Sequence, residues 1–166
     1  VPPSIPGPAP YITPDPALVS TGAMRFSLVS SASAALAPFC IGYAFRKGDI
    51  RAGQGVVGVI PHLQVTPKNY WSDGSLKFAI IAGAASLVAN SPKTITLSVG
   101  TSSTGTTLTT ANLKATGIAA SIACGAFGTV SWATTDWDLP FQSWVSGPEM
   151  SSWVYRKPVG SDAHLV

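Results

Sequence analysis

No segment of this 166-residue chain carries the polar face of an amphipathic helix. Such a helix repeats its apolar residues every 3.6 positions and places charged residues on its solvent side. Charged residues make up only 10% of this chain, and Glu149 is its sole glutamate. Ser and Thr supply the polar groups instead, and Thr favours strands while Gly and Pro favour turns. The sequence therefore predicts an all-β fold of short strands joined by tight turns.

Alternation of apolar and polar side chains predicts the first strand at residues 24–28. An aromatic and apolar run at 39–45 predicts a second strand, which ends in a turn that contains Gly48. Residues 30–37 have no readable period, and residues 111–126 are rich in Ala and could hold a short helix, although Gly117 weakens it. Further strands are predicted at 62–66, 94–99, 106–109, 129–133 and 151–156.

The strongest local signal is a hairpin within residues 70–81. Two β-like runs flank a Ser-Asp-Gly cluster, in which Asp73 can accept hydrogen bonds from amides of its own turn. Gly74 supplies the left-handed backbone conformation that such turns require. We expect Trp71, Asp73 and Gly74 to have a structural role.

The distribution of charges and the length of the apolar runs argue against two classes of partner. Ten basic and seven acidic residues give a net charge of +3, but the basic residues are scattered, whereas a nucleic-acid groove needs them clustered. The longest weakly polar run, residues 78–89, is too short to cross a membrane. No nucleic acid and no membrane insertion are therefore expected, and a poorly charged surface favours association with other subunits, most simply as a homo-oligomer.

Cys40 and Cys124 lie 84 positions apart and have no zinc-site spacing. Both are flanked by small or apolar residues, which favours two buried free thiols over a disulfide.

Residues suited to catalysis are few. The glycines at 53, 55 and 58 match a dinucleotide-binding spacing, but no helix pattern follows them and Pro61 intervenes. His62 is interpreted as an ordinary strand histidine, and Asp162 with His164 would supply only two metal ligands. The sequence therefore predicts no enzyme, no catalytic residue, no metal site and no cofactor.

Aromatic residues crowd into the last third of the chain, close to two carboxylates. Exposed Trp side chains beside carboxylates can bind sugar rings, since the ring face stacks and the carboxylates accept hydroxyl hydrogen bonds. The competing interpretation is that these aromatics fill a core or a subunit contact. The candidate residues for a carbohydrate site or an interface are Trp132, Asp136, Trp137, Asp138, Trp144 and Trp153.

Residues 1–23 are expected to form an extended arm or linker, because seven prolines fall within residues 1–16. Such an arm would lie along a neighbouring subunit or space the domain from a preceding one, and the equally weighted alternative is an inert tail.

Three segments carry a family resemblance: residues 38–50, the Trp-x-Asp-Gly-Ser hairpin with its second strand at 71–79, and Ser146-Gly147-Pro148 with Trp153. Together they resemble the N-terminal RIFT-type β-barrel domain of the rhamnogalacturonan exolyase-like family, which is also similar to modules of bacteriophage tail and baseplate proteins. The resemblance implies a single small β-barrel over residues 24–166, with a pattern that would continue beyond Val166. In the lyases it implies chemistry in a following helical domain, so no catalytic residue is carried over.

Two functions agree with these observations. The first is a non-catalytic structural or interaction module of a phage virion or a similar assembly. The second is an accessory carbohydrate-binding domain of a polysaccharide lyase-like protein. Either one implies a virion or extracellular location.

Overall fold

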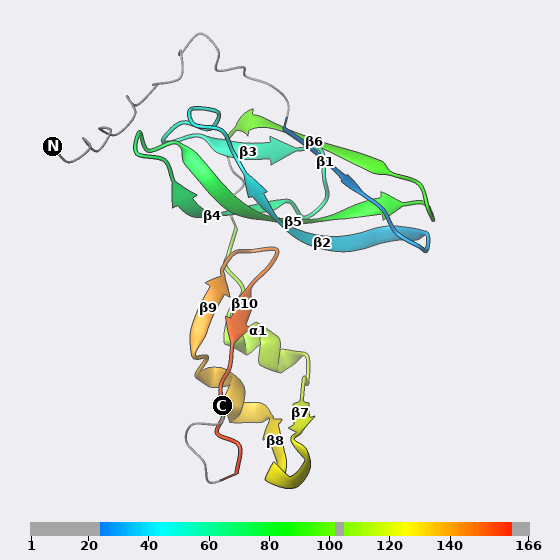
Figure 1. Ribbon diagram of the computed structural model, residues 1–166, viewed down its shortest axis with the longest axis vertical. Helices are drawn as coiled ribbons and strands as arrows, with labels where there is room; N and C mark the ends of the chain where they lie inside the picture. The colour runs from blue at the N-terminus through cyan, green and yellow to red at the C-terminus, as the bar shows by residue number, and fades with distance from the viewer. Residues whose placement is uncertain (1–23, 102–104, 161–166) are drawn as a thin grey trace, which may run out of the picture.

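The computed structural model describes residues 24–101 and 105–160. The expected arm at residues 1–23, together with Asp162 and His164, lies outside these residues. The described chain is built mainly of short antiparallel strands with little helix, which confirms the all-β prediction (Figure 1).

Residues 24–101 form two three-stranded sheets. In the first sheet, β6 (Lys93–Gly100) lies between β1 (Met24–Leu28) and β3 (Gly55–Gly58). In the second, β5 (Leu76–Leu87) lies between β2 (Ala34–Ala44) and β4 (Gln64–Tyr70). Each central strand is long and apolar on at least one face, so both sheets can bury a face against each other.

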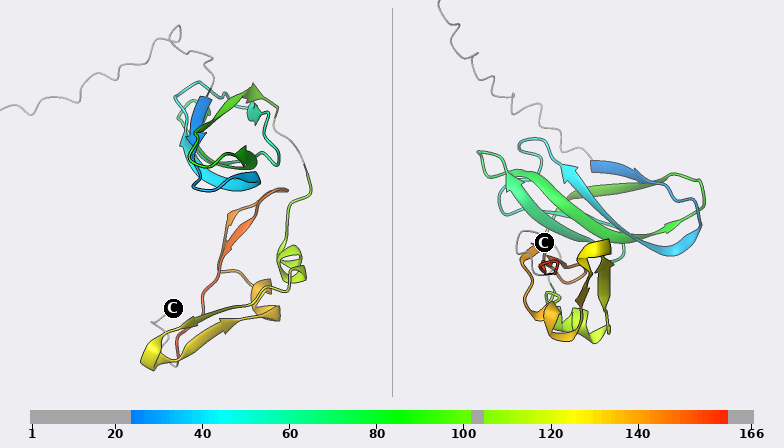
Figure 2. Two further views of the ribbon diagram at one scale, coloured as in Figure 1. Left: turned by 90° about the vertical axis from the view of Figure 1, so that its right-hand side faces the viewer. Right: turned by 60° about the horizontal axis from the view of Figure 1, so that its bottom comes forward.

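The two sheets share one hydrophobic core. Ile81 of β5 and Leu97 of β6 are fully buried, and Phe45 and Ile50 close the core from the connection that follows β2. Aromatic rings of β1 and β2 add to it, with the Phe26 and Phe39 centroids 5.6 Å apart in an edge-to-face arrangement. In the left view of Figure 2, these strands curve around a common interior.

Residues 105–160 extend away from the two sheets in Figure 1 and form smaller elements. Two two-stranded sheets pair β7 (Ala120–Ala123) with β8 (Thr129–Trp132) and β9 (Gln142–Val145) with β10 (Ser152–Val154). They are joined by α1 (Thr110–Ala115) and by the 3-10 turns η2 (Gly125–Phe127) and η3 (Thr134–Asp138). Only Val130, Trp137 and Val145 are buried apolar side chains in this part.

The expected single closed barrel is not shown. Each of the four sheets ends in edge strands, and β7 to β10 pair with no strand of the first two sheets. The strands of residues 24–101 enclose a core without a continuous ring of hydrogen bonds.

Most predicted strands are present, but the structure differs from the predictions at residues 106–109 and refines them at residues 111–126. Residues 106–109 are not a strand, because Thr109 is the N-cap of α1: its backbone N donates to Asn112 Oδ1 at 2.8 Å in a capping box. The short helix expected within 111–126 ends before Gly117, whose φ of 70° stops it, and the segment then continues as β7.

The cysteine prediction was half right. Both thiols are free, but Cys40 is exposed and Cys124 is only partly buried. Cys40 lies on the outer side of β2, since its neighbours Phe39 and Ile41 are the residues that pack against the core. Flanking apolar residues therefore misled the burial prediction.

Candidate functional site

The structure places the six predicted site residues in different environments. Trp137 is buried in η3, Trp132 and Trp153 are half-buried in β8 and β10, and Trp144 of β9 is exposed. The tryptophans thus do not share one exposed face.

Trp137 is the centre of the small core of residues 105–160. Its ring meets Tyr155 edge to face, with centroids 4.9 Å apart, and its Nε1 donates to Ile118 O at 3.0 Å. The Tyr155 hydroxyl donates to Trp137 O at 2.9 Å. Burial, followed by the nearby Asp138 carboxylate, raises the pKa of Tyr155 above its ordinary value of 10.0. These bonds indicate that Trp137 supports the fold of this part.

Both predicted carboxylates are paired with lysines. Asp136 Oδ1 lies 2.7 Å from Lys157 Nζ, and Asp136 Oδ2 accepts a hydrogen bond from Ala133 N at 2.9 Å. The Lys157 hydrogen bond is the main cause that lowers the pKa of Asp136 below its ordinary 3.8. Asp138 is held by Lys114 Nζ at 2.7 and 2.9 Å. A sugar hydroxyl would have to compete with these contacts.

The exposed aromatic faces also carry cations. Lys68 Nζ lies 4.7 Å from the centre of the Trp144 ring, and the Arg156 guanidinium lies 3.5 Å from that of Phe141. Lys68 also donates to Trp144 O. The structure therefore brings the predicted residues into one region without assembling a free stacking platform.

The predicted hairpin turn has the expected geometry. Asp73 Oδ1 accepts from Ser75 N at 3.0 Å and from Ser75 Oγ at 2.6 Å, and Gly74 has a φ of 81°. Trp71 Nε1 donates to Phe45 O at 3.1 Å, which fixes the turn to the end of β2. The Ser75 bonds are the main cause that lowers the pKa of Asp73 below 3.8.

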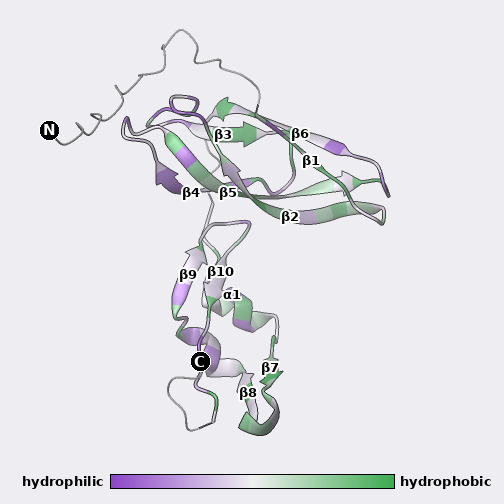
Figure 3. Cartoon of the chain, viewed as in Figure 1, coloured by the Kyte–Doolittle hydropathy of each residue, from purple (hydrophilic) through white to green (hydrophobic). Residues whose placement is uncertain are grey.

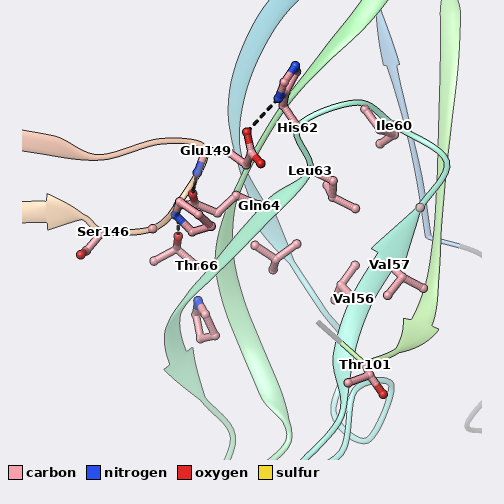
Figure 4. A pocket seen from close by; sticks show the side chains of 15 residues that line it. Val56, Val57, Ile60, His62, Leu63, Gln64, Thr66, Thr101, Ser146 and Glu149 are labelled. Atoms are coloured by element: carbon pink, nitrogen blue, oxygen red, sulfur yellow. Dashed lines mark hydrogen bonds and ion pairs between the residues drawn. The ribbon is translucent and has the colours of Figure 1, made fainter. Parts of the chain in front are cut away.

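A cleft of about 490 Å³ lies between β3, β4 and residues 146–149 (Figure 4). Val56 and Val57 of β3 face Gln64 and Thr66 of β4 across it, and Glu149 lies at its rim. Residues of both parts of the chain therefore line the cleft.

Gln64 binds residues 149 and 150 on the β4 side of this cleft. Its side chain is 6% exposed, its Oε1 accepts from Glu149 N at 2.9 Å, and its Nε2 donates to Thr66 Oγ1 at 3.0 Å. Two more bonds join Gln64 to the backbone of Met150. A buried amide with all its bonding groups satisfied stabilises the loop that it holds.

His62 and Glu149 form an exposed pair above Gln64. His62 Nδ1 lies 2.8 Å from Glu149 Oε2, and His62 has a φ of 57°, a conformation rare for residues other than glycine (Figure 4). The pair also borders a second hollow of about 330 Å³, lined by Pro38, Phe39 and Gly83 among others.

A His–carboxylate pair can move a proton when a third group receives it. No third His, Cys, Asp or Glu joins this pair to form a metal-binding group within residues 24–101 and 105–160. The His62–Glu149 pair forms a contact between residues 24–101 and residues 105–160.

Sequence reasoning missed Gln64 and Glu149 as partners. They lie 85 positions apart, and no local pattern connects them. The one available signal was that Glu149 is the only glutamate and follows the Ser146-Gly147-Pro148 turn.

Comparisons with protein-family models, with curated proteins and with solved structures found no significant match to this chain.

Within the part of the chain that the structure describes, no helix has the length and apolar character needed to cross a membrane.

Proposed function

We propose that this chain is a non-catalytic structural or interaction module of a larger assembly, such as a phage tail or baseplate. In this proposal the two sheets of residues 24–101 are the counterpart of the small RIFT-type β-barrel, and residues 105–160 are the part that meets neighbours. The shared core between β5 and β6 supports the first half of the proposal.

The observation that carries the proposal is the exposed apolar surface of residues 105–160. Only Val130, Trp137 and Val145 are buried there, whereas the following large apolar side chains are exposed: Ile118, Ile122, Phe127, Leu139, Phe141, Trp144 and Val154. In residues 105–160, seven large apolar side chains are thus exposed and only three apolar side chains are buried. Burial against other subunits would remove this surface from water.

The site chemistry is consistent with a non-enzymatic role. Catalysis needs a positioned acid or base that is free to act on a substrate. Asp136 and Asp138 are held by lysines, and Trp137 is part of the core. Three of the six candidate residues, Asp136, Trp137 and Asp138, are thus engaged in contacts within the chain.

Accessory carbohydrate binding is the second candidate, because Trp144 and Phe141 remain exposed at 49% and 55%. A sugar ring could stack on them only after Lys68 and Arg156 had moved from their faces. This cost makes the second candidate weaker than the first.

Light scattering on the purified chain over a wide range of concentrations tests the proposal. The expected result is a mass that rises with concentration toward a defined oligomer or a filament. A strictly monomeric mass at every concentration would refute self-association. Uronic-acid and rhamnose polymers would then be titrated against the chain and against Trp144→Ala, because saturable binding that this variant loses would establish the carbohydrate function instead.

A further inference from the structure

Strand β7 is exposed along its whole length. All four residues from Ala120 to Ala123 are exposed, and the strand is bonded to β8 on one edge only. Figure 3 colours β7 mostly green, as expected from two alanines and an isoleucine. Among residues 24–101 and 105–160, none bonds to its outer edge. A free strand edge offers a row of unpaired backbone donors and acceptors to another strand.

Edges of the larger sheets carry features that prevent such pairing. β1 contains Arg25, β2 contains Pro38, and β4 contains Lys68 next to a break in its register. Charged residues, prolines and bulges at an edge are the usual protection against pairing with another chain. β7 contains none of them.

The edges of the other small strands have neighbours. Lys157 Nζ donates to Ser131 O of β8 at 2.7 Å, and Lys68 donates to Trp144 O of β9. β3 and β10 are less accessible, because every residue of these two strands except Val154 is buried or half-buried. β7 therefore differs from these strands in being exposed at every residue, with no charge, proline or bulge at its edge.

The surroundings of β7 are electrically neutral. Residues 115–135 contain no charged side chain, in a chain whose net charge is +3. The nearest charges beyond them, Lys114 and Asp136, are neutralised by Asp138 and Lys157. An identical neutral surface complements this one, because two copies meet there without like-charge repulsion, whereas a strongly charged partner would find no opposite charge.

We propose that β7 is the edge at which a second copy of this chain adds, antiparallel and about a twofold axis. A strand paired antiparallel with its own copy satisfies a twofold axis, and twofold dimers are the commonest oligomers. The result is a four-stranded sheet in the order β8-β7-β7-β8 across the two copies. The inference rests on the proposed function and names the partner and the surface.

Pairing in this way also covers apolar surface. Ile122 is 57% exposed on β7, and Phe127 is 65% exposed at the tip of the same hairpin. A two-stranded hairpin alone is only marginally stable in water, and a sheet of four strands is more stable. Because each β7 has only four residues, the contact is small, and we expect a weak, concentration-dependent dimer.

Sedimentation equilibrium of Ile122→Lys against Val59→Lys tests the proposal. Both variants put the same charge in place of an exposed aliphatic residue, but Val59 lies outside β7. Like charges placed opposite each other across the axis should weaken the dimer of Ile122→Lys by about tenfold or more. Val59→Lys should keep the wild-type dissociation constant.

Amide hydrogen exchange of the unmodified chain at low and high concentration provides a second readout, which needs no variant to fold. Protection of residues 120–123 should rise with concentration. If the chain associates but Ile122→Lys dimerises like the wild type, or β7 protection is constant, the β7 contact is refuted while the assembly function stands. Equal weakening by both variants would also refute it, because net charge would then be the cause. A monomer at all concentrations refutes the function itself.

Discussion

The side chain of Gln64 pairs with the backbone of Met150 as a neighbouring strand would. Its Nε2 donates to Met150 O at 2.9 Å, and its Oε1 accepts from Met150 N at 2.8 Å, across 86 positions of sequence. One buried side chain thus connects β4 of the larger sheets to the turn between β9 and β10. The His62–Glu149 pair and the bond from Lys68 to Trp144 O are further polar contacts between these two parts of the chain.

Replacement of Gln64 by Leu should therefore destabilise the chain strongly. The substitution keeps the volume but leaves Glu149 N, Met150 N and Met150 O without their partner. Unpaired buried polar groups cost about 1–3 kcal/mol each, so we expect the free energy of unfolding to fall by about 3 kcal/mol. Urea denaturation followed by Trp fluorescence measures it.

Thr66→Val is the matched control for that substitution. It removes only the acceptor of the Gln64 Nε2 bond and should cost about 1 kcal/mol. Equal losses in the two variants would mean that the bonds to residues 149 and 150 do not carry the attachment.

Gly147→Ala tests the close approach of the turn to the same side chain. A Cβ on Gly147 would overlap the Gln64 carboxamide, and Gly147 has no left-handed backbone conformation that would add strain. Overpacking of this kind costs about 1–3 kcal/mol. In a Gln64→Ala background the overlapping atoms are gone, so the cost of Gly147→Ala should largely vanish in a double-mutant cycle. Additive losses would show that the overlap is not the cause.

Local sequence patterns predicted those strands that are marked by their own alternation of apolar and polar residues or by an adjacent turn sequence. The 24–28 strand and the Trp71 hairpin depend only on neighbours in sequence, and both are present. The division into separate sheets could not be predicted, because it depends on which strands pair at long range. The start of α1 was missed, because the Thr-x-x-Asn cap at Thr109 was interpreted as part of a strand at 106–109.

Site residues were predictable by type but not by environment. An aromatic and acidic cluster was visible in the sequence, yet the partners that occupy it, Lys114 and Lys157, lie about 20 positions away from their carboxylates. No sequence pattern pointed to Gln64, because the backbone groups that bind its side chain lie at residues 149 and 150, far away in sequence.

Protonation of Asp73 should weaken the hairpin turn in acid. The bonds from Ser75 favour the carboxylate, so the folded-state pKa of Asp73 lies below the ordinary 3.8. A group with a lowered pKa stabilises the fold above its unfolded-state pKa and loses that contribution as the pH falls through the folded-state value. NMR titration should thus find the Asp73 pKa below 3.8, and Ser75→Ala should raise it toward that value. An unchanged pKa in Ser75→Ala would assign the shift to another group.

The contrast between two tryptophans decides whether the aromatic cluster is a core or a platform. Trp137 is 6% exposed and packs on Tyr155, so Trp137→Ala should lower the free energy of unfolding by about 3–5 kcal/mol. Trp144 is 49% exposed and has mainly the Lys68 contact to lose, so Trp144→Ala should cost about 1 kcal/mol or less. Urea denaturation of both variants makes the comparison. A small loss in Trp137→Ala would contradict its assignment to the core, and a large loss in Trp144→Ala would mean that this exposed ring already serves the stability of the single chain.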